Sequence, residues 1–142
     1  MRASSILAAS ASLLSLAQAR IYGIGVPSTI KAGDTFDLIV EAQNYVQTVT
    51  DVSIAVGYSA GTYPASEALG TFITAFDLVE DSNTATNYNK SVTLPASVEA
   101  GTTFLTASVY SLYGAVAGPT LVPYNVSFTV GDETSTTYVF SA

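Results

Sequence analysis

Apolar residues along most of the chain recur at every second position, which is the spacing of β-strands and not of helices. The clearest case is the segment 52–58, where three aliphatic residues and a tyrosine alternate with serine, alanine and glycine. β-Branched and aromatic residues dominate the runs between turn residues. The pattern predicts strands near residues 21–26, 35–42, 52–58, 71–76, 89–94, 104–111 and 124–130, with at most one helical turn at 64–69, ended by Gly70.

This spacing of short strands predicts an all-β fold, an immunoglobulin-like antiparallel β-sandwich of about seven strands. The chain has no cysteine and no tryptophan. It therefore lacks the disulfide and the buried tryptophan of antibody domains. The prediction concerns the architecture and does not place the chain in the antibody family.

A ten-residue pattern occurs twice, at 27–36 and at 95–104. Both copies read Pro-x-(Ser/Thr)-(Ile/Val)-x-Ala-Gly-x-Thr-Phe, with Gly33 and Gly101 at the same place. Proline ends a strand, and glycine permits the positive φ of a turn. We expect two structural corners at one end of the sandwich, each crossing between its sheets, and favour them over a glycine-rich ligand loop.

The N-terminus has the layout of a secretory signal peptide. Arg2 precedes a short run of Leu, Ile, Ala and Ser at 6–16, and Ala17-Gln18-Ala19 is a small-x-small cleavage site. The run is well short of the ~20 apolar residues that span a bilayer. The sequence thus predicts a signal peptide at 1–19, one β-sandwich domain at 20–131 and a polar tail at 132–142. That tail is left with two alternatives, an added edge strand or a mobile end.

Charge and residue usage exclude several classes of function. The chain carries 11 acidic and 4 basic residues, and it has no histidine or cysteine. The acidity argues against binding of nucleic acid or anionic membranes. Triads that need His or Cys, and zinc sites built on them, are impossible. We therefore expect a protein that is not an enzyme and holds no cofactor or metal.

Carboxylates are the remaining candidates for chemistry, either as a paired-acid hydrolase or as a calcium loop. No spacing matches either site, so solvated surface charge is the favoured interpretation. The groups considered are Asp34, Asp37, Glu41 and Asp51 around one strand, and Asp77, Glu80 and Asp81 in a later loop.

Two triplets, Asn89-Lys90-Ser91 and Asn125-Val126-Ser127, are N-glycosylation sequons. In both strands the asparagine alternates with buried-type residues, so we expect Asn89 and Asn125 to face solvent. Each is a candidate glycan acceptor.

The connection 113–123 is uncharged and partly apolar. In a sandwich of this type it meets two other loops at one end, so Tyr45, Tyr113, Val116 and Leu121 are candidate contacts with a partner protein. The alternative is that Val116 and Leu121 fold back onto the core.

The chain resembles the fungal necrosis-inducing secreted protein family of effectors (Nis1-like). The resemblance lies in Arg20-Ile-Tyr-Gly-Ile after the signal and in the segments 26–33, 49–58, 68–71 and 94–101. It implies an effector of plant-associated fungi that binds and inhibits immune receptor-associated kinases, suppresses pattern-triggered defence and provokes cell death in some hosts. No binding residue can be carried over, because these motifs are structural.

The leading hypothesis is a secreted, non-enzymatic, monomeric effector that binds a host protein outside the fungus or after delivery into host cells. The alternative is a secreted carbohydrate-binding, cell-wall-binding or wall-structural module, suggested by secretion and by 9 tyrosines. The absence of tryptophan counts against sugar stacking.

Overall fold

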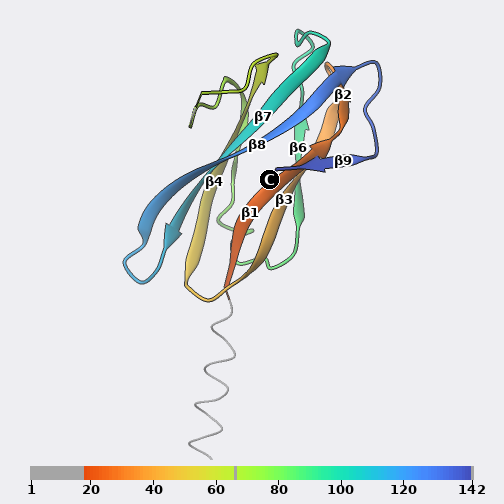
Figure 1. The fold of residues 1–142 in the computed structure, drawn as a ribbon. Helices are drawn as coiled ribbons and strands as arrows, with labels where there is room; N and C mark the ends of the chain where they lie inside the picture. Colours follow the sequence, from red (N-terminus) through yellow and green to blue (C-terminus); the bar gives the residue numbers. More distant parts are fainter. Residues whose placement is uncertain (1–17, 66, 142) are drawn as a thin grey trace, which may run out of the picture.

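Nine β-strands make up the regular structure of the described part of the chain (Figure 1). The computed structural model describes residues 18–65 and 67–141. The strands are β1 (Gln18–Pro27), β2 (Thr29–Lys31), β3 (Thr35–Tyr45), β4 (Val49–Ala60), β5 (Thr71–Asp77), β6 (Tyr88–Thr93), β7 (Gly101–Tyr113), β8 (Gly118–Gly131) and β9 (Tyr138–Phe140). No helix occurs in these two ranges, and hence none that could cross a membrane.

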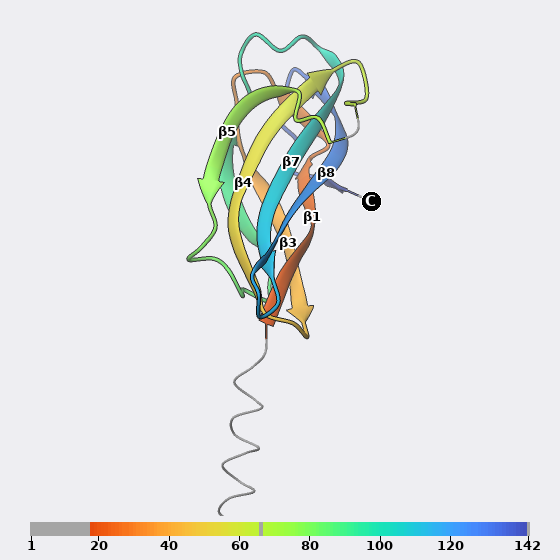
Figure 2. The same cartoon turned by 90° about the vertical axis from the view of Figure 1, so that its left-hand side faces the viewer.

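Two sheets pack face to face, which confirms the predicted all-β sandwich. One has the order β6-β3-β1-β9 and the other the order β2-β8-β7-β4-β5 (Figures 1 and 2). The structure adds two details to the predicted sandwich of about seven antiparallel strands. The three-residue strands β2 and β9 are additional, and β2 pairs with β8 in parallel. Both are too short for an alternating pattern to reveal them.

The strand at 71–77 lies beside β4, with Ile54 opposite Phe76. In an immunoglobulin constant domain the fourth strand lies beside the fifth, in the other sheet. Here it extends the five-stranded sheet instead. Where the helical turn was expected before it, the Ala68 N–H donates a hydrogen bond to the Ala65 carbonyl at 2.9 Å, and none of the described residues is helical.

The core lies between the sheets and is built from alternate residues of both. Its fully buried side chains include Ile24, Leu38 and Val40 from the four-stranded sheet and Ile54 and Leu105 from the other. Each aliphatic side chain buried in this way contributes about 1.5–3 kcal/mol of hydrophobic stabilisation. Because the chain contains no cysteine, this packing is not supplemented by disulfides.

The two repeated segments form corners that meet at one end of the sandwich. Gly33 and Gly101 have φ angles of 90° and 126°, which favour glycine. The Gly33 N–H donates to the Leu94 carbonyl at 2.9 Å, so the first corner is bonded to the start of the second. Ile30 and Val98, at matching positions of the repeat, are both part of the core.

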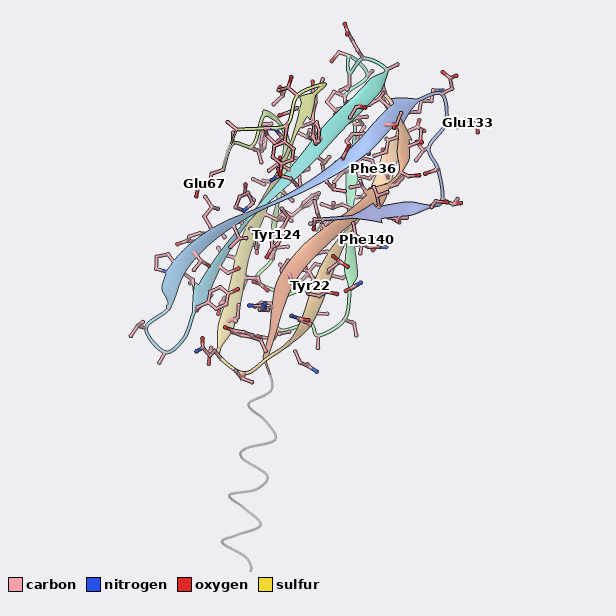
Figure 3. All side chains as sticks on the ribbon, viewed as in Figure 1. Tyr22, Phe36, Glu67, Tyr124, Glu133 and Phe140 are labelled. Atoms are coloured by element: carbon pink, nitrogen blue, oxygen red, sulfur yellow. The ribbon has the colours of Figure 1, made fainter. Side chains whose placement is uncertain are left out.

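The C-terminal segment runs from the five-stranded sheet to the edge of the four-stranded one. The Ser135 N–H donates to the Thr29 carbonyl at 2.9 Å, and the Ser28 N–H donates to the Thr137 carbonyl at 2.8 Å. β9 then pairs with β1, with Phe140 opposite Gly25 (Figure 3). Of the two alternatives for the tail, the structure has the added edge strand.

At the other terminus, residues 1–17 of the predicted signal peptide lie outside the described residues. Its last two residues, Gln18 and Ala19, pair with Tyr45 and Asn44 in the structure. Cleavage at the predicted site would therefore start β1 at Arg20.

Candidate functional site

Three connections meet at the end of the sandwich opposite the glycine corners. They are 46–48 between β3 and β4, 78–87 between β5 and β6, and 114–117 between β7 and β8. The Gly114 N–H donates to the Thr48 carbonyl at 2.8 Å. Ser82 joins the connection 78–87 to β4, because its Oγ accepts a hydrogen bond from the Asp51 N–H at 2.9 Å. We call this region the hairpin end.

The connection at 113–123 is shorter than its sequence indicates. β7 continues to Tyr113 and β8 begins at Gly118, so most of the expected loop forms a regular hairpin. Leu121 therefore lies on a strand, directly opposite Tyr110. Period-two alternation is hard to detect there because Gly118, Pro119 and Pro123 interrupt the apolar pattern.

Tyr45 and Tyr113 are brought into direct contact at the hairpin end. Their ring centroids are 5.9 Å apart and their planes perpendicular, an edge-to-face arrangement. The Arg20 guanidinium lies 4.9 Å from the centre of the Tyr45 ring. Both tyrosines are half-buried. Their contact and the Arg20 guanidinium restrict both tyrosine side chains at this end of the sandwich.

Val116 and Leu121 do not fold back onto the core. Val116, in the β7–β8 turn, is 90% exposed, and Leu121 is 64% exposed. Val46, in the facing β3–β4 turn, is 93% exposed. Exposed apolar side chains gathered at one end of a small domain are typical of a contact surface.

Asp51 is buried behind this surface, whereas the sequence placed it among solvated carboxylates. That interpretation was wrong because a β-bulge between Asp51 and Ser53 turns the Asp51 side chain inward. The Ser111 hydroxyl donates to Asp51 Oδ1 at 2.7 Å. Burial raises the pKa of the Asp51 carboxyl, and the Ser111 hydrogen bond offsets part of the rise. Burial, with the charges of Asp51 and Asp81, also raises the pKa of the Tyr88 hydroxyl.

We expect Asp51 to make the protein more stable in acid than at neutral pH. A carboxyl with a raised pKa binds its proton more tightly in the folded state than in the unfolded chain. Its contribution is therefore fully present below the unfolded pKa, about 3.9 for aspartate, and is lost as pH rises through the folded pKa. Asp51→Asn keeps an acceptor for Ser111 but cannot ionise, so the variant should lose less stability between pH 4 and 7.

Urea unfolding of both proteins at several pH values measures this difference. Asp132→Asn is the matched control, because Asp132 is exposed on the C-terminal segment, and it should keep the wild-type pH dependence. If the free energy of unfolding of Asp51→Asn depends on pH as that of the wild type does, the pH dependence does not come from the buried Asp51 carboxyl.

The acidic connection after β5 makes its own local contacts. Asp77 Oδ1 accepts a hydrogen bond from the Val79 N–H at 2.8 Å, and Asp81 forms an ion pair with Lys90 at 2.5 Å. Within residues 18–65 and 67–141, no group of three or more Asp, Glu, His or Cys residues is placed to hold a metal ion.

The two sequons differ in their surroundings. Asn89 is exposed on the edge strand β6. Asn125 is half-buried, and its Oδ1 accepts a hydrogen bond from the Thr106 hydroxyl at 2.5 Å. Both remain candidate glycan acceptors, Asn89 the more accessible.

Fold and surface together define a cysteine-free β-sandwich with exposed apolar side chains at its hairpin end. The chain matches the Nis1 family over residues 17–129 and belongs to that family, which confirms the resemblance seen in the sequence.

Two relatives, both named necrosis-inducing secreted protein 1, are each 48% identical to the chain over 138 residues. The one from Colletotrichum higginsianum is aligned over 95% of this chain and 94% of its own length. For the one from Colletotrichum orbiculare the shares are 95% and 84%. The names of these relatives bear out the predicted secretion, and the protein is extracellular.

Proposed function

We propose that the protein is a secreted effector that induces necrosis and acts, without catalysis, by binding a host protein. Membership of the Nis1 family and the names of its relatives support the effector role. For the partner we propose an immune receptor-associated kinase of the plant host, as the family resemblance implies.

The observation that carries binding is the exposed apolar surface of the hairpin end. Val116 in the β7–β8 turn and Leu121 on β8 project into solvent, and Tyr113, at the end of β7, contacts Tyr45. No charged residue occurs between Glu99 and Asp132. Aromatic and aliphatic side chains in an uncharged setting favour a protein contact in which they are desolvated. The absence of His and Cys supports a mode of action without nucleophilic catalysis of the Ser-His or Cys-His kind.

The test is binding of the purified mature protein to the recombinant catalytic domain of such a kinase. The double variant Tyr113→Ala/Leu121→Ala is expected to bind at least about tenfold more weakly, because a few residues carry most of the binding energy of an interface and tyrosine is enriched among them. Expression of both proteins in leaves shows whether defence suppression and cell death follow binding.

A matched double variant on the other side of the molecule is Tyr22→Ala/Phe140→Ala, whose side chains are also exposed. It should bind like the wild type. If the wild type does not bind and leaf defence is unchanged, the proposed function is wrong. Co-sedimentation with chitin, glucan or cellulose would instead support a wall-binding module.

A further inference from the structure

The outer face of the five-stranded sheet carries no charged residue on its three central strands, β4, β7 and β8. The outward positions of β4, β7 and β8 follow from their pairing, with Tyr110 flanked by Ser53 and Leu121, and Ser108 flanked by Ala55 and Pro123. None of the outward residues on these strands is Asp, Glu, Lys or Arg. We call this surface the uncharged face; it is turned toward the viewer in Figure 2.

Large apolar side chains are exposed at both ends of the uncharged face. Leu121 and Tyr110 lie toward the hairpin end, 64% and 37% exposed, and Phe72 lies at the β5 edge, 61% exposed. Between them Ala55 and Ser108 are small, which leaves the middle of the sheet flat. Such a surface is suited to a folded partner, which can cover a broad flat area.

The segment 61–70 forms one border of this face. The Tyr63 ring lies edge-on to Phe104, with centroids 5.2 Å apart. Leu69 covers Gly57 so closely that a Cβ there would lie 2.5 Å from the Leu69 carbonyl oxygen. The part of the face next to the segment 61–70 is thus already covered by the chain itself, and the part nearer the hairpin end is open.

The opposite outer face, on the four-stranded sheet, differs in character. It presents Asp37 on β3 and Ser91 on β6, both exposed. A sequon does not distinguish the two faces, because Asn89 lies on this one and Asn125 on β8 of the other. Glu41, four residues further along β3, lies on the same side of the strand as Asp37. Charged and hydrated groups of this kind favour solvent, so the two faces of the sandwich are not equivalent.

Carboxylates border the uncharged face along its β5 side. Glu67, Asp77 and Glu80 are all exposed there, and Figure 3 shows Glu67 projecting beside the sheet. A second copy of this chain would bring its own acidic border against them, because the chain has a net charge of −7. A partner with Lys or Arg around an apolar centre would instead be complementary in charge.

We propose that the uncharged face docks a folded host protein domain whose contact surface is apolar at its centre and basic at its rim. This inference rests on the proposed function, because the partner is the host protein proposed above. It extends the contact surface from the hairpin end onto the adjoining part of the uncharged face. The apolar centre supplies affinity, and the acidic border accelerates association and sets the orientation of the partner.

The test measures association and dissociation of the same kinase catalytic domain with charge-introducing variants. Ser108→Arg places a cation in the middle of the uncharged face, and Tyr22→Arg is the matched change on the opposite sheet, at an exposed position of β1 outside both sequons. Ser108→Arg should weaken binding at least about tenfold, because it buries an unpaired charge at the interface, whereas Tyr22→Arg should bind like the wild type. The triple variant Glu67→Gln/Asp77→Asn/Glu80→Gln should associate more slowly and depend less on salt.

Leu121→Arg, at a 64% exposed position, replaces Ser108→Arg if the latter does not fold. Absence of wild-type binding overturns the proposed function and this proposal with it. Wild-type binding that Ser108→Arg and Leu121→Arg leave unchanged overturns the docking face alone. Sedimentation velocity gives the remaining outcome: a wild-type dimer that Ser108→Arg dissociates would show that a second copy occupies the face and would also overturn the proposal.

Discussion

Replacing Leu105 by alanine is expected to lower the free energy of unfolding by about 2–5 kcal/mol. Leu105 lies on β7, is fully buried and belongs to the core between the sheets. Its truncation removes buried apolar surface and leaves a cavity that the flanking strands cannot fill without breaking their ladders. Because no cysteine is present, no disulfide limits the loss. For a domain with the usual stability of 5–15 kcal/mol, this is a large fraction.

Urea unfolding followed by far-ultraviolet circular dichroism measures the change. The same substitution on the neighbouring strand, Leu121→Ala, is the control, because Leu121 is 64% exposed. It should change stability by less than about 0.5 kcal/mol. If the two variants lose equal stability, packing between the sheets is not what holds the fold together.

The second large effect is expected at Gly57, where any side chain would collide with the segment 61–70. A Cβ would lie 2.5 Å from the Leu69 carbonyl oxygen and 2.8 Å from the Thr71 carbonyl oxygen, which are main-chain atoms. Relief requires the segment to move off the sheet or β4 to shift, so Gly57→Ala should destabilise the protein by about 1–3 kcal/mol. Thr106, opposite Gly57 on β7, is fully buried as well.

The matched control is Gly118→Ala at the start of β8. There the nearest atom to an added Cβ is the Tyr113 carbonyl oxygen at 3.5 Å, an ordinary contact. This variant should be neutral or slightly more stable, because alanine restricts the unfolded chain. Thermal unfolding of both variants checks the pair, and a Gly57→Ala protein as stable as the wild type would show that Leu69 does not pack on the sheet as described.

Much of the fold could be predicted from the sequence, because the core of a sandwich depends on alternation. Val56 and Leu38 are buried at every-second-residue positions of β4 and β3, as the pattern requires. The repeated corner could be predicted because proline and glycine restrict the backbone locally. These signals lie within a few residues of the structure that they specify.

Features that depend on contacts between distant segments could not be predicted in this way. The bulge at Val52 reverses the side to which Asp51 points, and nothing near Asp51 in the sequence announces it. β2 and β9 are three residues each and exist because β8 and β1 offer them a free edge. β5 joins β4 rather than β6, a choice that alternation leaves open.

The candidate site was predicted in part. The sequence indicated that Tyr45, Tyr113, Val116 and Leu121 would gather at one end, and the structure places Tyr45 and Tyr113 in contact. Their role in binding stays a prediction. Sequence reasoning missed that Tyr110 and Leu121 are neighbours on the outer face of a sheet, because pairing between β7 and β8 brings them together. The absence of charged residues from 100 to 131 was the signal that could have pointed to this face.

The most direct measurement is nuclear magnetic resonance of the ¹⁵N-labelled mature protein during titration with the host kinase domain. The account predicts that amide signals of β4, β7 and β8 around Ala55, Ser108 and Leu121 shift or broaden, together with those of the β7–β8 turn, while signals of β3 and β6 stay unchanged. Changes confined to β3 and β6, or no change at saturating kinase domain, would contradict it.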